Sequence, residues 1–233
     1  MASAALGQPD IAALAALIAD NSRAAMIAAL LGGRALPASE LARLAGVTPQ
    51  TASAHLRKLQ DSGLISCERY GRHRYFALSG PHVAELWEAL APLAPPAPIR
   101  SLRAATVAGA LADARTCYDH LAGRLGVALA DVLLERGWLL SHDGEWLLTF
   151  AGRSGLAAFG IEVSSLDAGN RRLIGRCLDW SERRPHLSGA LGAAIARHCL
   201  ELGWLTPAQG SRALRVTDVG REGLANVFGL SLD

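Results

Sequence analysis

The spacing of apolar residues between positions 37 and 78 changes from a helical period to a strand-like one. A first helix is predicted over residues 39–45, because its apolar residues recur at helical spacing: Leu41, Leu44 and Ala45. We expect Ser39 to cap this helix by accepting a hydrogen bond from a backbone N–H, and Gly46 to end it. The pattern predicts a short helix followed by a tight turn.

A second helix is predicted from Thr48, which can cap it, through Pro49, whose missing N–H is harmless at a first helical position. It continues to about residue 63 with one apolar face: Ala52, Leu56 and Leu59. The side chains around that face are short or polar: Gln50, Thr51, Ser53, Ala54 and Arg57. Such a surface could bring donors and acceptors to base edges in a DNA major groove without steric exclusion.

A basic hairpin is predicted next, because residues 64–69 and 73–78 are strand-like runs on either side of Tyr70, Gly71 and Arg72. Between positions 34 and 76 there are seven Lys or Arg and three acidic residues, in a chain whose net charge is only +2. This excess charge suits contact with phosphates, so the segment is interpreted as a DNA-reading unit. The alternative is a helical hairpin with a solvated basic face, and the agreement of cap, turn, polar face and hairpin in order and spacing disfavours it.

Residues 10–92 resemble the ArsR/SmtB family of winged-helix repressors. The resemblance rests on Ser53 and Ala54, followed by His55-Leu56, two residues, Leu59 and then Gly63-Leu64. It implies a homodimer on a two-fold operator, with dimer contacts from residues 11–18 and 82–90. It also implies that base contacts fall to Gln50, Thr51, Ser53 and Ala54 and phosphate contacts to Arg57, Arg72 and Arg74. His55 completes the candidate DNA-binding set, although a His beside a core Leu is more often a partly buried helix-packing residue.

Composition indicates an intracellular protein of more than one domain, because the 233 residues are 51% apolar and 19% charged without a run long enough to span a bilayer. The start, MASAALGQPD, is unlike a secretory signal, so we expect a cytoplasmic protein with no membrane partner. The widely spaced cysteines are unlike a disulfide framework and are expected to be thiols, metal ligands or redox sensors: Cys67, Cys117, Cys177 and Cys199.

Four prolines between positions 92 and 98 predict a stiff extended connector, because each removes a backbone donor and restricts the preceding residue. We therefore expect a winged helix-turn-helix and dimerisation domain over residues 1–92, a linker over 93–100 and an effector domain over 101–233.

The effector domain contains an internal duplication. Residues 120–139 align without gaps on residues 186–205, with twelve of twenty positions identical, and TFAGRSGLA at 149–157 recurs as TDVGREGLA at 217–225. Each copy is predicted to contain a helix, Gly-Trp-Leu, a hairpin, a Thr cap and a short helix. The expected fold is mainly α with small β-hairpins (α+β), with winged-helix-like repeats at about 108–161 and 174–230.

These repeats are not expected to read DNA, because residues 109–161 carry four basic and six acidic side chains. Trp138 and Trp204 each lie between Gly and Leu and are expected to anchor the core of their repeats rather than to stack on a ligand. Cys199 aligns with Leu133 and is interpreted as a small buried hydrophobe.

The candidate effector site is built from Cys117, His120, Cys177 and His186. Cys117 and His120 are three residues apart, which would place them on one side of a helix, and Cys and His are the ligands of zinc, cadmium, lead or copper(I). If the repeats pack face to face, the four side chains could converge. The alternatives are that His120 and His186 cap the starts of matched helices, or that Cys117 and Cys177 form a redox or persulfide switch.

The family resemblance favours a metal, since many ArsR/SmtB repressors release DNA on binding one. This chain departs from the family's sites, however: residues 39–45 contain no Cys, and the helix after the wing offers only His82. Any site must lie in the added half of the chain. We predict a dimeric repressor of double-stranded operator DNA that an effector ion or small molecule releases.

The rival hypothesis is an enzyme or small-molecule module on a DNA-binding domain, with Cys117 as nucleophile and His120 or His186 as base. The sequence contains no evident Gly-rich phosphate loop, nucleophile elbow or paired carboxylates. The chain is therefore expected not to be an enzyme, with a thiol-responsive or organic-ligand-responsive regulator as the main alternative to a metal sensor.

Overall fold

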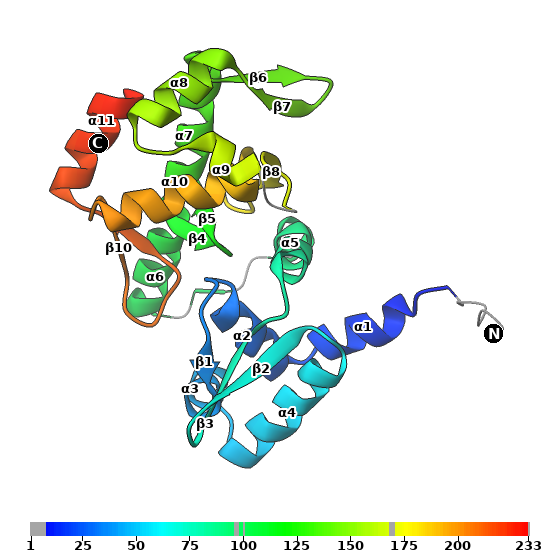
Figure 1. Cartoon of the computed structure of the whole chain (residues 1–233). Helices are drawn as coiled ribbons and strands as arrows, with labels where there is room; N and C mark the ends of the chain where they lie inside the picture. Colours follow the sequence, from blue (N-terminus) through cyan, green and yellow to red (C-terminus); the bar gives the residue numbers. More distant parts are fainter. Residues whose placement is uncertain (1–7, 96–97, 100, 168–170, 233) are drawn as a thin grey trace. The chain divides into compact units, whose positions relative to one another are not determined.

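The computed structural model describes residues 8–95, 98–99, 101–167 and 171–232 and divides into two compact units, Met1–Val83 and Ala84–Asp233 (Figure 1). The first unit contains α1 (Ile11–Ile18), α2 (Asn21–Leu30), β1 (Leu36–Pro37), α3 (Ala38–Ala45), α4 (Pro49–Asp61), β2 (Ile65–Tyr70), β3 (His73–Leu78) and the start of α5 (Pro81–Leu90). The division falls inside α5, earlier in the chain than the prolines at 92–98, of which Pro96 lies outside the described residues.

The first unit packs α2, α3 and α4 around an apolar centre beside a three-stranded sheet in the order β1-β3-β2. Its fully buried side chains include Met26, Ile27, Leu30, Leu41, Leu56, Leu59 and Phe76. The predicted turn between α3 and α4 is confirmed: Gly46 adopts a φ of 66°, and the Thr48 side chain accepts a hydrogen bond from the Thr51 backbone N–H at 3.2 Å. These local signals place α4 as the second helix of a helix-turn-helix.

The prediction that Ser39 caps α3 is wrong. The cap position is Pro37, which has extended backbone angles and makes no side-chain capping bond. Pro37 pairs with Tyr75 in the β1–β3 ladder, so the strand ends where the helix begins and Ser39 falls inside the first turn. The hairpin is confirmed, although Tyr70 belongs to β2 and pairs with His73, leaving Gly71 and Arg72 as the turn.

The second unit contains the remainder of α5 and the 3-10 turn Ala91–Leu93, followed by a longer series of short elements. These are α6 (Leu102–Asp113), β4 (Arg115–Cys117), β5 (His120–Ala122), α7 (Gly123–Glu135), β6 (Leu139–His142), β7 (Glu145–Leu148), α8 (Phe150–Ala158), α9 (Val163–Asp167), β8 (Gly175–Leu178), β9 (Pro185–Ser188), α10 (Gly189–Glu201), β10 (Leu205–Pro207), β11 (Leu214–Val216) and α11 (Asp218–Phe228).

Hairpin, helix, hairpin and helix follow one another twice in this unit, once from β4 to α8 and once from β8 to α11 (Figure 1). Thr149 and Thr217 cap the last helix of each series, accepting from Gly152 N at 2.9 Å and Gly220 N at 3.0 Å. One apolar core runs through both series and includes Leu133, Leu139, Leu156, Leu191, Cys199, Trp204, Leu224 and Phe228, with Trp138 packed against it. The expected core roles of Trp138, Trp204 and Cys199 are confirmed.

His120 and His186 do not begin helices, which corrects the sequence prediction. His120 lies on β5, directly across the β4–β5 ladder from Cys117, and His186 lies on β9, directly across the β8–β9 ladder from Cys177. The helices start three residues later, at Gly123 and Gly189, whose φ angles of 76° and 83° are open to glycine and costly for other residues. The Cys–His spacing of three therefore reflects a tight hairpin instead of one side of a helix.

Among the described residues, no helix alone is long and apolar enough to cross a membrane, and α1 and α2 reach that length and composition only as a pair bent by 85°.

Candidate functional site

One surface of α4 is exposed and carries the side chains predicted to read bases. Ala52, Leu56 and Leu59 are at most 1% exposed, so the helix buries one face and presents the other. The exposed side chains are Gln50, Thr51, Ser53, Ala54 and Arg57. Ser53 Oγ donates to Pro49 O at 2.8 Å, which leaves its oxygen as an acceptor.

His55 is directed away from that surface. It is half-buried, with Nδ1 3.3 Å from an Arg23 guanidinium nitrogen and 3.9 Å from an Asp20 carboxylate oxygen. Both partners belong to the start of α2, since Asp20 caps that helix. The position fits the helix-packing interpretation better than a base contact.

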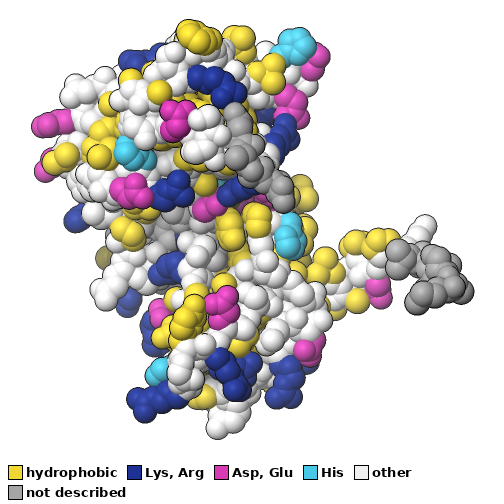
Figure 2. Space-filling model, viewed as in Figure 1, with side chains coloured by type: hydrophobic (Ala, Val, Ile, Leu, Met, Phe, Trp, Pro, Cys, Tyr) yellow, Lys and Arg dark blue, Asp and Glu magenta, His cyan; other side chains and the backbone are white. Residues whose placement is uncertain are grey.

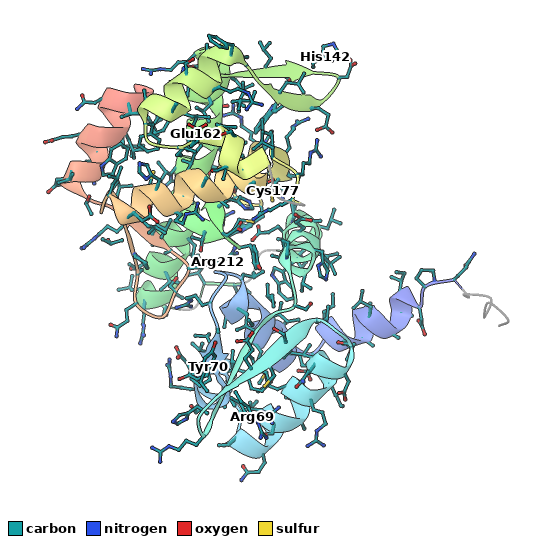
Figure 3. All side chains as sticks on the ribbon, viewed as in Figure 1. Arg69, Tyr70, His142, Glu162, Cys177 and Arg212 are labelled. Carbon is teal, nitrogen blue, oxygen red and sulfur yellow. The ribbon has the colours of Figure 1, made fainter. Side chains whose placement is uncertain are left out.

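The wing of the first unit, β2 and β3 with their turn, is basic and exposed. Arg72 and Arg74 are exposed, and Arg69 and Tyr70 lie at the same end of the hairpin (Figure 3). Arg74 lies along its strand, with Nε donating to Cys67 Sγ at 3.4 Å. Lys and Arg side chains gather where α4 and the wing lie (Figure 2). Tyr70 is 65% exposed, and its hydroxyl donates to Glu68 Oε2 at 3.2 Å.

Cys117, His120, Cys177 and His186 come together in the second unit, where their ligand atoms all lie within 4.8 Å of one another. The two sulfur atoms are 3.8 Å apart, and the centroids of the two imidazole rings are 5.1 Å apart. Strands β5 and β9 contact each other, so each hairpin contributes one Cys and one His. We name these four residues the Cys–His cluster.

Two glycines allow the helices to cover the Cys–His cluster closely. A Cβ atom on Gly126 of α7 would lie 3.6 Å from the His186 Cβ and 2.5 Å from Leu121 O, and one on Gly192 of α10 would lie 3.2 Å from the His120 Cβ. Helix α7 of the first series therefore packs over the β8–β9 hairpin, and helix α10 of the second series packs over the β4–β5 hairpin. This exchange holds the two hairpins side by side.

His120 is held by a partly exposed carboxylate. Its Nδ1 lies 3.4 Å from Asp119 Oδ1, and Asp119 is paired with the Arg171 guanidinium. Burial would raise the pKa of Asp119, but His120 and Arg171 lower that pKa to about 2. The carboxylate is therefore charged and can fix the orientation of the ring.

His186 is held by a fully buried carboxylate. Its Nδ1 lies 3.3 Å from Asp179 Oδ2, which also accepts from Arg115 at 2.9 Å and from the Gly123 backbone N–H at 2.6 Å. Asp179 and Arg115 have side chains that are 0% exposed. Burial would raise the pKa of Asp179, but His186 and Arg115 hold that pKa far below its usual value. Burial alone would lower the pKa of His186, but the Asp179 carboxylate and the Cys177 sulfur raise that pKa above its usual value.

The Cys–His cluster contains unused ligand atoms. Within the described part of the chain, His120 Nε2 and both ring nitrogens of His186 are buried and have no hydrogen-bond partner, because the 3.3 Å ion-pair contact between His186 Nδ1 and Asp179 lacks hydrogen-bond geometry. A hydrogen bond from the Cys117 thiol lowers the pKa of Cys177; burial opposes this shift, and the two imidazoles add to it. The same hydrogen bond and burial raise the pKa of Cys117. The cluster thus offers two sulfur atoms and two imidazole Nε2 atoms that have no hydrogen-bond partner.

The gap-free alignment of residues 120–139 with 186–205 leaves Cys117 and Cys177 outside the matched block, but the structure shows that they correspond. Cys117 and Cys177 occupy equivalent cross-strand positions, each opposite a His. Two residues separate Cys117 from His120 and eight separate Cys177 from His186, so an alignment without gaps could not match the two cysteines.

Known proteins resemble parts of this chain. A family model described as a helix-turn-helix domain matches residues 18–68. Among solved structures, reduced HlyU from Vibrio cholerae N16961 is 23% identical and covers 36% of this chain and 86% of its own, with a TM-score of 0.32. The winged helix-turn-helix domain Mb0332 from Mycobacterium bovis is 28% identical and covers 36% of this chain and 85% of its own, with a TM-score of 0.31.

A relative of nearly the same length matches almost the whole chain. The HTH-type transcriptional regulator YdfF of Bacillus subtilis (strain 168) is 42% identical over 213 residues, which cover 91% of this chain and 94% of that protein. The match therefore includes the second unit as well as the helix-turn-helix. The chain belongs to the family of HTH-type transcriptional regulators and is a DNA-binding protein.

Proposed function

We propose that this regulator is a cytoplasmic homodimeric repressor that leaves its operator when a metal ion of the zinc, cadmium or lead class binds to the Cys–His cluster. One observation carries the proposal: the ligand atoms of Cys117, His120, Cys177 and His186 lie within 4.8 Å of one another. Two sulfurs and two imidazoles form a donor set for soft and borderline ions, whereas magnesium and calcium prefer oxygen.

The distance between the sulfurs supports a tetrahedral ion. Zinc–sulfur bonds of about 2.3 Å in a tetrahedron place two sulfurs about 3.8 Å apart. The Cys117 and Cys177 sulfurs are 3.8 Å apart without any adjustment of the hairpins. A structural zinc geometry therefore fits between them.

The imidazoles are also oriented for metal binding. Nδ1 of His120 and of His186 each faces an aspartate, which leaves Nε2 of both rings free to bind the ion. A carboxylate behind a metal-bound His fixes its tautomer and makes it a better ligand. In this proposal Cys117 Sγ, Cys177 Sγ and the two Nε2 atoms hold the ion, and loading displaces the remaining thiol proton.

DNA binding is assigned to the exposed surface of α4 and to the wing. We propose base contacts from Gln50, Thr51, Ser53 and Ala54, and phosphate contacts from Arg57, Arg72 and Arg74. Arg72→Glu combined with Arg74→Glu is expected to lower operator affinity at least tenfold at low salt and to reduce the salt dependence of binding, since each phosphate contact contributes a slope of about 0.9. Fluorescence anisotropy of promoter fragments measures both.

The matched control for that variant is Arg103→Glu combined with Arg197→Glu, which makes the same charge change on exposed helical positions of the second unit. Equal loss of affinity in both variants, or no loss in the wing variant, would contradict the DNA assignment.

Dimerisation is assigned to α1, whose residues are all apolar and none of which is buried. Ile11 is 67% exposed, and Leu86 and Leu90 of α5 are each 37% exposed. A second copy of the chain would cover these side chains, as the sequence resemblance implies. Light scattering of the purified chain is expected to give the dimer mass, and a monomer at micromolar concentration would contradict the assignment.

The metal proposal is tested on protein purified under reducing conditions. We expect one zinc or cadmium ion per chain by elemental analysis and at least tenfold weaker operator binding of the loaded protein. The Cys117→Ser, Cys177→Ser double variant is expected to bind DNA and to lose both the metal and the response. Cys67→Ser is the control, because Cys67 lies in the wing strand outside the Cys–His cluster. Operator affinity that is the same with and without metal would refute the sensing role.

A thiol switch is the second candidate, and the sulfur separation of 3.8 Å beside a low-pKa Cys177 favours it. A peroxide would take two electrons from Cys117 and Cys177 to form a disulfide, with the protons leaving in water. Mass spectrometry would then show a loss of two hydrogens that accompanies DNA release in metal-free protein. Resistance of the thiols to peroxide would exclude this route.

A further inference from the structure

A small pocket opens beside the Cys–His cluster. Its volume is about 220 Å³, and it is lined by Glu85, Glu88 and Ala89 from α5, by Arg176, Cys177 and Leu178 from β8 and by Ser188 from β9. Cys177 therefore belongs both to the cluster and to the pocket wall.

Cys177 is the exposed side of the cluster. Cys117, His120 and His186 are 1%, 3% and 0% exposed, whereas Cys177 is only half-buried. A cation from solvent can reach the first three ligands only past other side chains, but it meets Cys177 at the pocket. The pocket therefore gives access to the cluster at Cys177.

Glu88 lines the same pocket and has a free buried oxygen. The residue is 1% exposed; its Oε1 accepts from Arg212 at 2.6 Å, and its Oε2 has no hydrogen-bond partner among the residues described. A buried carboxylate oxygen without a partner is costly unless something else binds it. Its chemistry is that of a cation ligand.

Arg212 connects Glu88 to the strand that carries Cys117. The guanidinium that holds Glu88 also donates to Thr116 O at 3.3 Å, and Thr116 N donates to Arg212 O at 3.0 Å. Thr116 immediately precedes Cys117. The Glu88–Arg212 ion pair thus joins α5 to the β4–β5 hairpin within the second unit.

We propose that this pocket is the port through which the metal ion reaches the Cys–His cluster, and that Glu88, buried in the pocket wall, binds the passing ion in competition with Arg212. The inference rests on the proposed metal-binding function and adds a route and a regulatory contact to it. A carboxylate oxygen is a known ligand of zinc-class ions.

Competition for Glu88 also gives the ion a way to act on the wing. Helix α5 begins three residues after β3 ends, so the chain runs from the wing almost directly to Glu88. An ion that draws Glu88 from Arg212 loosens the contact between α5 and the β4–β5 hairpin while the cluster fills.

The test is the rate of cadmium loading, followed in a stopped-flow instrument by the ultraviolet absorbance of cadmium–thiolate bonds. Glu88→Gln removes the charge of the carboxylate in the pocket wall, and Leu178→Trp narrows the pocket from the strand side. Both are expected to slow loading at least tenfold while one cadmium ion per chain still binds at equilibrium. Arg212→Gln is expected to accelerate loading, because Glu88 then has no competing cation.

The control is Glu135→Gln, which removes an exposed carboxylate of α7 outside the pocket and is expected to load within twofold of the unmodified rate. Unmodified rates in both Glu88→Gln and Leu178→Trp would overturn the port. A failure of the unmodified protein to bind cadmium would instead refute the metal site itself, so the two failures are distinguishable.

Discussion

The β4–β5 and β8–β9 hairpins supply the same pair of side chains to the Cys–His cluster but hold them differently. In β8–β9, the carboxylate behind His186 is Asp179, which is 0% exposed and paired with the equally buried Arg115. In β4–β5, the carboxylate behind His120 is Asp119, which is 32% exposed and paired with an Arg171 that is 34% exposed. The carboxylate behind His186 therefore lies in a buried network, and the carboxylate behind His120 lies in a solvated pair.

This difference assigns separate tasks to the two carboxylates. A buried ion pair is rigid, because any movement leaves a charge without a partner. The Asp179–Arg115 pair joins both hairpins, since Arg115 is the first residue of β4. The turn that carries Asp119 is held by the solvated pair with Arg171. In the proposed mechanism the Asp179 side of the site positions the ion, and the Asp119 side adjusts to it.

The largest expected effect follows from Asp179→Asn. This change leaves the buried Arg115 guanidinium without a counter-charge, so we expect a loss of about 3–5 kcal/mol in the free energy of unfolding. Urea denaturation of metal-free protein measures it. Asp143→Asn, at an exposed turn position, is the control and is expected to change stability by less than about 0.5 kcal/mol. A small effect of Asp179→Asn would remove the distinction between the two carboxylates.

A smaller effect on stability but a clear effect on metal binding is expected from Asp119→Asn. Because the Asp119–Arg171 pair is partly solvated, its loss should cost at most about 1 kcal/mol of folding stability. The His120 ring loses its charged partner, so we expect zinc or cadmium affinity to fall roughly 10–100-fold. Isothermal titration with a competing chelator measures the affinity. A stability loss as large as that of Asp179→Asn would contradict the assignment of Asp119.

The smallest effect concerns the pH dependence of Cys177 reactivity in metal-free protein. Because hydrogen bonding from Cys117 lowers the pKa of Cys177, the thiolate persists as pH falls below the ordinary cysteine value of about 8.5. Alkylation of Cys177 by iodoacetamide is therefore expected to change little between about pH 8 and pH 6, where an ordinary thiol slows almost a hundredfold. Peptide mass spectrometry locates the label, and a steep fall for Cys177 would contradict the thiolate.

The helix-turn-helix could be predicted in detail because its signals are local. Thr48 and Pro49 start α4, and Gly46 requires a left-handed turn, within a few residues of one another. Ser39 was assigned wrongly because the start of α3 depends on Pro37 pairing with Tyr75, a contact across 38 positions of sequence. Neighbouring residues therefore predicted the end of α3 and the start of α4, whereas the start of α3 depends on a long-range strand pairing.

For the Cys–His cluster, the residues could be predicted from the sequence but their geometry could not. Its four residues could be named from the sequence because Cys and His are few and lie near the repeat starts, but the geometry predicted for them was helical. The positive φ angles of Gly123 and Gly189, which begin α7 and α10, place both histidines on strands. The roles of Arg115 and Glu88 depend on partners 64 and 124 positions away and could not be predicted from residue patterns.

X-ray absorption at the zinc edge of the reduced, zinc-loaded protein tests the central claim most directly. The account predicts two sulfur neighbours at about 2.3 Å and two nitrogen neighbours at about 2.0–2.1 Å, with the sulfur signal lost in the Cys117→Ser, Cys177→Ser variant. A first shell of oxygen and nitrogen alone, or a sulfur signal that survives in that variant, would contradict it.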